Sequence, residues 1–305
     1  MLPNFLCIGA QKSGTTSMWH LLNAHPDIYM SATRETRFFF DDILYQEGLA
    51  KYEIKYFSNW DGQKMSGEKC PEYLCGPNVA ERIFGSLGAD TKFIVCLRNP
   101  AQRAFSQYRH NLVMLRESRS FEDALAEDAA NTKLNKPQLP AYGYISRGMY
   151  ATQIQAYLNF FAIDRFLFTS FENEIISDQE SLSQRVYHFL EVNPFLPKGL
   201  PFISGKPPLE NMRVQYDQAN KVLEISNEVK KRSLSNIFKK QPDSKIRIGE
   251  PSTQLIKFAE QFNKYVPTKT QLSAEQAIVI NQQYFEKEIV QLQQIINKDC
   301  SNWLN

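Results

Sequence analysis

The stretch from Phe5 to Leu22 constrains the fold of this chain more than any other stretch. It begins with an apolar run, FLCI, of the kind that forms a buried parallel strand. A loop containing Gly9 and Gly14 follows, and the sequence from Ser17 onward has the pattern of a helix. Backbone N–H groups at the start of such a helix point toward a bound anion, and the helix dipole adds positive charge there. The stretch therefore predicts a phosphate-binding strand–loop–helix unit.

The position of the lysine distinguishes this loop from the P-loop of nucleotide triphosphatases. The P-loop has the pattern G-x-x-x-x-G-K-[ST]. Gly9 and Gly14 keep that spacing, but Thr15 occupies the lysine position and the lysine is Lys12, inside the loop. An ammonium group there can reach the bridging oxygen of a nucleotide instead of a terminal phosphate pair. A simple strand–turn–helix corner with a chance lysine is the alternative.

A second apolar run, from Lys92 to Leu97, predicts another buried strand, and Arg98 follows it directly. Pro100 suits the first turn of a helix, and this helix carries Ser106. Because a guanidinium holds phosphate through paired, charge-assisted hydrogen bonds, Arg98 and Ser106 can bind one anion together. A surface arginine beside a turn is the alternative.

These two segments resemble motifs of the PAPS-dependent sulfotransferases, where PAPS is 3′-phosphoadenosine 5′-phosphosulfate. The first is similar to the family's 5′-phosphosulfate loop, G-x-Q-K-[ST]-G-T-[TS], and the second to its 3′-phosphate motif, R-[ND]-P-x-x-R-A-x-S-x-Y. The resemblance is to bacterial members, to the heparan sulfate and glycan sulfotransferases, and to related sulfotransferase domains of polyketide pathways, and it is weakest between residues 195 and 270. It implies that the donor is bound by Gln11, Lys12, Ser13, Gly14, Thr15, Thr16, Arg98 and Ser106. It also implies a catalytic role for Lys12, which stabilises charge on the leaving phosphate oxygen together with the N–H groups of Ser13 to Thr16. A looser match adds Lys206 and Arg213, in a basic loop that closes over the nucleotide.

Glu35 lies between Arg34 and Arg37, just before three phenylalanines. A carboxylate in such surroundings can act as a general base near neutral pH. The segment is similar to the K-E-x-x-F-F segment of the glycan sulfotransferases, with Arg34 in place of the lysine, and the resemblance implies that Glu35 deprotonates the acceptor hydroxyl. Arg37 stands where that family often has histidine, so the contacts to the acceptor stay open. A surface cluster of ion pairs is the alternative.

Lys69 belongs to a segment, GEKCPEYL, that resembles the family's G-E-K-[ST]-P-x-Y-[FL] pattern. The resemblance implies that Lys69 lies at the reaction centre and steadies the sulfuryl oxygens or the leaving group. Cys70 replaces the usual serine or threonine, which weakens any role for that side chain in substrate binding. An exposed lysine before a proline turn is the alternative.

Length and composition fit one large α/β domain or two small ones, and we expect a single domain over residues 1–305. The chain is 43% hydrophobic and 22% charged, and 35 basic and 33 acidic residues nearly cancel. A general affinity for nucleic acid or an anionic membrane is therefore not expected. The chain has no apolar stretch long enough to span a membrane and no visible signal peptide.

The cysteines and histidines point to a cytoplasmic protein without a metal. The five cysteines lie in or beside apolar runs and are expected to be reduced thiols. The four histidines are scattered, and no pair has the spacing of metal ligands. We therefore expect no metal site. A sulfuryl group also carries less negative charge than a phosphoryl group, so its transfer needs no divalent metal ion to neutralise it.

Sequence patterns predict further elements. We expect helices over 44–60, 79–87, 147–161 and 181–190 and a strand over 166–172. The segment 230–247 is basic and amphipathic, and is either a solvated helix face or a surface for an anionic acceptor or an acidic partner. The resemblance implies a closing helix over 284–292.

The order of these elements predicts a P-loop-like, three-layer α/β fold, with a mainly parallel central sheet and helices on both faces. The resemblance implies transfer of a sulfuryl group from PAPS to a hydroxyl, with release of adenosine 3′,5′-bisphosphate. A saccharide is the favoured acceptor, and a β-hydroxyacyl chain on a carrier protein is the alternative. A P-loop kinase or NTPase would need a lysine at position 15 and an aspartate for Mg²⁺ after a strand. A non-catalytic nucleotide-binding module would be expected to have lost part of the set formed by Lys12, Glu35, Lys69 and Arg98.

Overall fold

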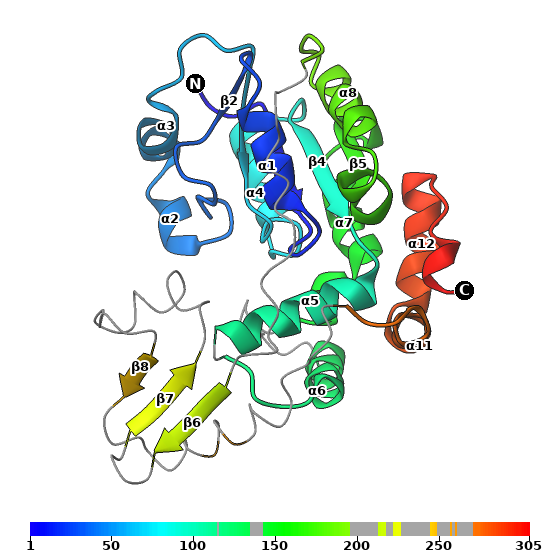
Figure 1. The fold of residues 1–305 in the computed structure, drawn as a ribbon. Coiled ribbons are helices and arrows are strands. Elements are labelled where there is room, and N and C mark those ends of the chain that lie inside the picture. The colour runs from blue at the N-terminus through cyan, green and yellow to red at the C-terminus, as the bar shows by residue number, and fades with distance from the viewer. Residues whose placement is uncertain are drawn as a thin grey trace. The chain divides into compact units, whose positions relative to one another are not determined.

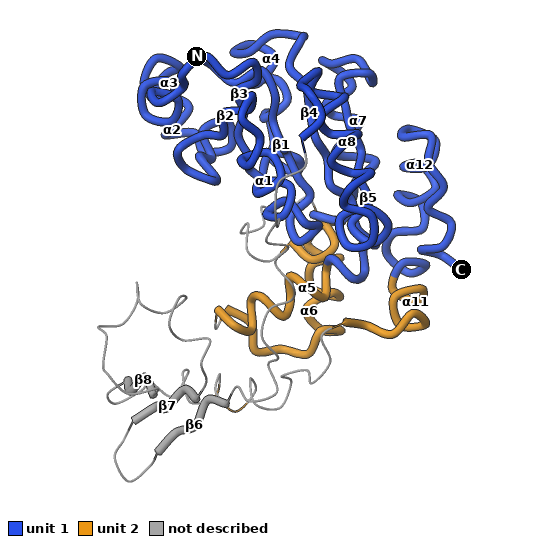
Figure 2. The backbone as a smooth tube through the Cα atoms, turned by 45° about the horizontal axis from the view of Figure 1, so that its top comes forward, with its two compact units in different colours: residues 1–103, 147–204, 281–305 blue, residues 104–146, 205–280 orange. Residues whose placement is uncertain are grey.

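The computed structural model describes residues 1–114, 116–134, 143–195 and 271–305, residues 257 and 260, and the backbone of three further strands. Lys206 and most of the basic segment 230–247 lie outside these residues. The chain forms two compact units (Figure 2): residues 1–103, 147–204 and 281–305 in unit 1, and residues 104–146 and 205–280 in unit 2. The expectation of a single domain over residues 1–305 stays a prediction.

Unit 1 contains a five-stranded parallel sheet (Figure 1), in the order β2-β3-β1-β4-β5. The strands are β1 (Phe5–Gly9), β2 (Ile28–Met30), β3 (Met65–Lys69), β4 (Lys92–Leu97) and β5 (Phe166–Ser170). Every residue of β1 and β3 is buried, as the uninterrupted apolar run at Phe5 predicts for a central strand. Because β1 lies between β3 and β4, the segments that follow these three strands are neighbours at one edge of the sheet.

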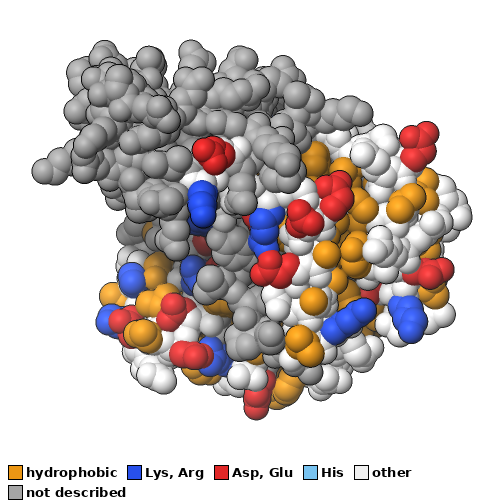
Figure 3. Space-filling model, turned by 90° about the horizontal axis from the view of Figure 1, so that it is seen from below, with side chains coloured by type: hydrophobic (Ala, Val, Ile, Leu, Met, Phe, Trp, Pro, Cys, Tyr) orange, Lys and Arg blue, Asp and Glu red, His pale blue; other side chains and the backbone are white. Residues whose placement is uncertain are grey.

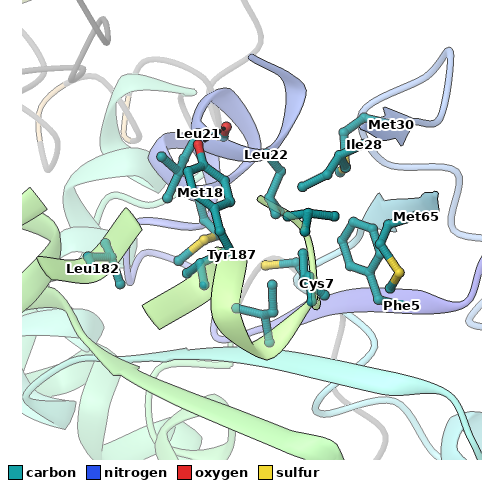
Figure 4. Packing of buried hydrophobic residues seen from close by; sticks show 14 of the residues in the cluster. Phe5, Cys7, Met18, Leu21, Leu22, Ile28, Met30, Met65, Leu182 and Tyr187 are labelled. Carbon is teal, nitrogen blue, oxygen red and sulfur yellow. Dashed lines mark hydrogen bonds between the residues drawn. The ribbon is translucent and has the colours of Figure 1, made fainter. Parts of the chain in front are cut away.

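Helices cover both faces of this sheet. Helix α1 (Thr15–Asn23) and helix α8 (Gln179–Phe189) share one apolar cluster with β1 and β4 (Figure 4), in which Met18 and Tyr187 pack with Cys7. On the other face, Phe93 of β4 packs against Tyr157 of α7 (Tyr150–Leu158). Helix α4 (Val79–Leu87) contacts α7 there. The expected three-layer α/β architecture is confirmed.

Several boundaries differ from the expectation. Residues 44–60 form two helices, α2 (Asp42–Gln46) and α3 (Leu49–Phe57), because Gly48 adopts a φ of 85° between them. The strand expected over 166–172 ends at Ser170, whose side chain accepts the N–H of Asn173 and begins a π-helical turn, η3 (Phe171–Ile176). The helix expected from residue 147 is a 3-10 turn, η1 (Ser146–Gly148), followed by α7. The end of the chain forms α11 (Ala274–Tyr284), α12 (Glu286–Ile296) and η5 (Ser301–Trp303).

Helix α5 (Pro100–Val113) begins in unit 1 and continues into unit 2. Unit 2 also contains α6 (Phe121–Lys133), whose N-cap is Ser120, and an antiparallel sheet of β6 (Arg213–Asp217), β7 (Val222–Ser226) and β8 (Lys245–Ile248). Strand β8 corrects part of the helical expectation for 230–247. Within unit 2, the buried carboxylate of Glu117 accepts hydrogen bonds from Arg119 and from the hydroxyl of Tyr144, and so connects the segment after α5 to the segment after α6.

Candidate active site

The loop between β1 and α1 has the geometry of an anion-binding loop. Lys12 has a φ of 70° and Gly14 a φ of 88°, so the chain turns sharply before the helix. A Cβ atom at Gly14 would lie 2.8 Å from Ile175, which excludes a larger residue. The first hydrogen bond of α1 runs from Met18 N to Gly14 O at 3.0 Å, so the N–H groups of Thr15, Thr16 and Ser17 precede it.

One amide of the loop has a different role from the expected one. The N–H of Ser13 donates to the carbonyl of Ala10 at 3.2 Å, within the loop. The backbone donors that can point toward an anion are therefore those at the start of α1. The expected donor set of Ser13 to Thr16 stays a prediction, and Thr15 and Thr16 are its members at the start of α1.

Arg98 lies directly against this loop. Its Nη1 donates to the carbonyl of Lys12 at 3.1 Å, its Cζ is 4.4 Å from the ring centroid of Phe171, and its Nε is 3.8 Å from Oε1 of Glu172. Arg98 is 9% exposed, and this burial lowers the pKa of its guanidinium while Glu172 and Tyr150 oppose the effect. Arg98 is therefore a largely buried cation beside the loop, and an added anion there would stabilise its charge.

Tyr150 fixes the backbone at Arg98. The phenol hydroxyl of Tyr150 donates to the carbonyl of Arg98 at 3.1 Å, and burial raises the pKa of Tyr150 to about 12. Ser106, the other residue expected at the 3′-phosphate, lies in the part of α5 that belongs to unit 2. Its role, like that of Arg213 in β6, stays a prediction.

Glu35 and Lys69 form an ion pair, with Lys69 Nζ donating to Oε1 of Glu35. Lys69 ends β3, is 1% exposed, and pairs in register with Cys7 of β1. The side chain of Glu35 is 46% exposed, so it faces solvent from one side and the buried lysine from the other. Two residues that were assigned to the reaction centre from separate motifs are therefore in direct contact.

Glu72 links the segment that follows Glu35 to the donor loop, the loop of Lys12 between β1 and α1. Its carboxylate is 3.0 Å from Nε of Arg37 and 3.6 Å from Nη2 of Arg147. Nη1 of Arg147 donates to Oε1 of Gln11 in the loop at 2.9 Å. A recess beside these groups is lined by Ala10, Gln11, Pro71, Leu74, Cys75, Arg147 and Gln153.

Further positive charge surrounds Glu35. The guanidinium of Arg34 stacks on Trp19, with Cζ 4.5 Å from the ring centroid, and that of Arg37 lies 5.3 Å from the ring centroid of Phe40. Burial, together with the charges of Arg34 and Lys69, lowers the pKa of His20. The local field therefore favours an anionic ligand, although the chain as a whole carries a net charge of only +2.

Sequence reasoning did not assign Arg147, Glu72, Tyr150 or His20 to this site. Arg147 had one available signal, because it is a charged residue inside the run YISRGMY. Glu72 and His20 had none, since an exposed surface residue would give the same local pattern.

The described residues contain no group of three or more histidine, cysteine, aspartate or glutamate side chains that could hold a metal ion. None of the helices in this part of the chain has the length and hydrophobicity needed to span a bilayer. On the face drawn in Figure 3, the described basic and acidic side chains are interspersed without a continuous patch of either sign.

Comparison with known proteins identifies the family. A family model described as the sulfotransferase domain matches residues 2–245. The chain belongs to the sulfotransferase family. The expected family and enzyme class, a transferase, are thus confirmed.

Among curated sulfotransferases, the chain is 35% identical over 136 residues to the membrane-associated sulfotransferase kil1 of Dictyostelium discoideum, covering 42% of this chain and 28% of that protein. It is 33% identical over 188 residues to heparan sulfate glucosamine 3-O-sulfotransferase 6 of Mus musculus, covering 62% of this chain and 52% of the relative. The chain thus spans about half the length of the heparan sulfate relative and 28% of the length of kil1.

A sulfotransferase from Alicyclobacillus acidocaldarius shares the fold. Its crystal structure superposes with a TM-score of 0.65 and 23% identity, and the alignment covers 100% of both chains. This sulfotransferase structure confirms the predicted P-loop-like α/β fold.

Proposed function

We propose that this chain transfers a sulfuryl group from PAPS to a hydroxyl group of a saccharide and releases adenosine 3′,5′-bisphosphate. The observation that carries the proposal is the contact between Lys69 and Glu35, at the edge of the sheet where the loop of Lys12 begins. Membership of the sulfotransferase family supports the reaction class, and the heparan sulfate relatives support a saccharide.

The residues at this edge fit the phosphate groups of the donor. The start of α1 offers backbone donors, and the buried guanidinium of Arg98 lies 3.1 Å from the loop carbonyl of Lys12. When bound, PAPS supplies an activated sulfuryl group. Lys12 and the N–H groups of Thr15 and Thr16 stabilise negative charge at the leaving oxygen, and Arg98 fixes the register of the nucleotide, which is a positioning effect.

Glu35 and Lys69 divide the remaining work. Glu35 takes the proton of the acceptor hydroxyl, because its carboxylate is exposed on one side and held on the other. Lys69 holds Glu35 in place and steadies charge on the transferred group. We further propose that Ser106 holds the 3′-phosphate together with Arg98, and that Lys206 and Arg213 belong to a loop that closes over the nucleotide. We also propose that no metal takes part and that the enzyme is bacterial. The five free cysteines support a location in the cytoplasm.

A screen with purified protein tests this function. PAPS is offered with heparan sulfate, with a simple phenol, and with a β-hydroxyacyl chain on a carrier protein, with EDTA present throughout. Calorimetry compares binding of adenosine 3′,5′-bisphosphate with binding of ATP and Mg²⁺. We expect transfer to heparan sulfate and preference for the bisphosphate. Transfer only to the carrier-bound chain would replace the saccharide, and preference for ATP with Mg²⁺ would indicate a kinase or NTPase. Tight binding of the bisphosphate without transfer to any acceptor would indicate a non-catalytic module.

A further inference from the structure

The hydroxyl of Tyr73 is the centre of a buried hydrogen-bond cluster beside the segment that carries Glu35. It donates to Oε1 of Glu68 at 2.6 Å. It lies 3.1 Å from the hydroxyl of Thr36 and accepts the backbone N–H of Phe39 at 3.3 Å. Tyr73 and Glu68 are 0% exposed and Thr36 is 3% exposed. One phenol oxygen therefore holds two points of the chain just after Glu35.

The proton of Tyr73 goes to Glu68, and the hydroxyl oxygens of Tyr73 and Thr36 lie 3.1 Å apart. The oxygen of Thr36 in turn accepts the N–H of Phe38 at 3.2 Å. The amides of Phe38 and Phe39 are thus bonded to side chains, so the conformation of this loop depends on them.

Strand β3 holds the same segment from both sides. Successive side chains of a strand point to opposite faces, so Glu68 and Lys69 point apart. Lys69 binds Glu35 directly, and Glu68 holds the residues after Glu35 through Tyr73. Glu68 pairs in register with Leu6 of β1, the strand that leads into the loop of Lys12. The cluster therefore connects the segment of Glu35, through β3, to β1, the strand that precedes the loop of Lys12.

A carboxyl group in this position is costly to the fold. Burial raises the pKa of Glu68 to about 7, although hydrogen bonds from Thr36, Tyr73 and Tyr52 act in the opposite direction. An apolar side chain of similar size would avoid the cost of burying this group. Ionisable groups kept at such a cost are enriched at functional sites.

We propose that Tyr73 and Glu68 are positioning residues, which set the location of Glu35 through the hydrogen bonds of the Tyr73 hydroxyl. The proposal rests on the proposed function, in which Glu35 accepts the proton of the substrate hydroxyl. Neither residue touches the substrate. Their effect is on the rate of the chemical step, because a general base displaced by about 1 Å is poorly placed to accept the proton of the acceptor hydroxyl.

The first test removes the hydroxyl alone, in Tyr73→Phe. We expect kcat to fall roughly 10- to 100-fold, the scale of a misplaced catalytic group. The Kd for adenosine 3′,5′-bisphosphate should not change, and hydrogen exchange at Phe38 and Phe39 should become faster. Tyr187→Phe is the matched control, since Tyr187 is 1% exposed and its hydroxyl donates to the carbonyl of Leu21 at 3.2 Å. It should lower thermal stability and leave kcat unchanged.

The second test uses two substitutions of Glu68. Glu68→Gln keeps an oxygen that accepts from Tyr73, so it should retain most of kcat, whereas Glu68→Leu removes the acceptor and should lose kcat to the extent of Tyr73→Phe. Equal kcat values for these two variants, or a wild-type kcat in Tyr73→Phe, would overturn the proposal and leave the proposed function intact. If the wild-type chain sulfates none of the acceptors in the screen, the proposed function fails and the proposal fails with it. If Glu68→Leu does not fold, Tyr73→Phe decides alone.

Discussion

Nη1 of Arg98 donates a hydrogen bond to the carbonyl oxygen of Lys12 at 3.1 Å, so the arginine after β4 contacts the loop after β1 directly. The sequence indicated two separate anion-binding segments, and in the structure the two are joined by this bond. Each segment therefore depends on the other for its geometry.

Arg98→Ala should weaken binding of adenosine 3′,5′-bisphosphate roughly 10- to 100-fold, because a charged hydrogen bond contributes about 1.5–3 kcal/mol. Isothermal titration calorimetry measures this Kd. Arg165→Ala is a suitable control, since Arg165 pairs with Asp90 at 3.0 Å on the surface. An unchanged Kd in Arg98→Ala would exclude Arg98 from the nucleotide site.

Glu35→Gln should reduce kcat by about two to four orders of magnitude, the contribution of a general base. The Kd of the bisphosphate should stay near that of the wild type, because Glu35 bonds Lys69 and not the nucleotide loop. Steady-state kinetics with the acceptor from the screen gives the first quantity and calorimetry the second. The control is the exposed Glu81 of α4, changed to glutamine. A variant that binds the nucleotide poorly but turns over normally would contradict the assignment of Glu35 as base.

Glu72→Gln should lower the free energy of unfolding by up to about 3 kcal/mol, the lower end for breaking a buried ion pair. The side chain of Arg147 is 6% exposed and loses the charge of its ion-pair partner in this variant, while its bond to Gln11 remains. Urea denaturation measures the change. Glu180→Gln, at an exposed position of α8, should have little effect. Equal stability of the two variants would show that Glu72 does not neutralise Arg147.

Glu68→Gln should stabilise the protein at alkaline pH and not at acid pH. The carboxyl titrates near 4.5 in an unfolded chain and at about 7 in the folded protein. Between pH 4.5 and pH 7 the folded chain keeps this proton and the unfolded chain loses it. The stability contributed by the protonated form is therefore complete below pH 4.5 and is lost as the pH rises through 7. Glutamine does not titrate, so the variant should gain on the order of 3 kcal/mol over the wild type above neutral pH.

Thermal melts of both proteins across this pH range measure the difference. A constant difference in Tm between the wild type and Glu68→Gln would mean that Glu68 is already charged at low pH in the folded state.

The sequence was sufficient for the central sheet because apolar runs such as those at Phe5 and Lys92 are long enough to require burial on both faces. Element ends were less predictable. The strand at Phe166 was expected to continue to Glu172, but Ser170 caps a π-helical turn instead, and nothing in the local apolar pattern distinguishes the two.

The candidate site shows the same division. Lys12, Glu35, Lys69 and Arg98 were found from motifs, and the structure brings Glu35 to Lys69 and Arg98 to the backbone of Lys12. The bonds of Tyr73 and Arg147 join residues distant in the chain, 136 positions apart for Arg147 and Gln11. Such contacts depend on the order of strands in the sheet, which the local pattern does not contain.

Gly67 lies two positions before Lys69, and the ring of Phe5 packs over it, so that a Cβ atom at Gly67 would lie 2.3 Å from that ring. This flat contact is where β3 and β1 meet, with Phe5 opposite Gly67 and Cys7 opposite Lys69. An alanine at position 67 would push the two strands apart or slide one along the other, and a slip of one residue would turn Lys69 to the wrong side of the sheet. In a survey of inactive variants, substitutions at Gly67 would thus be mistaken for damage to the chemistry, although this glycine has no side chain with which to reach a substrate.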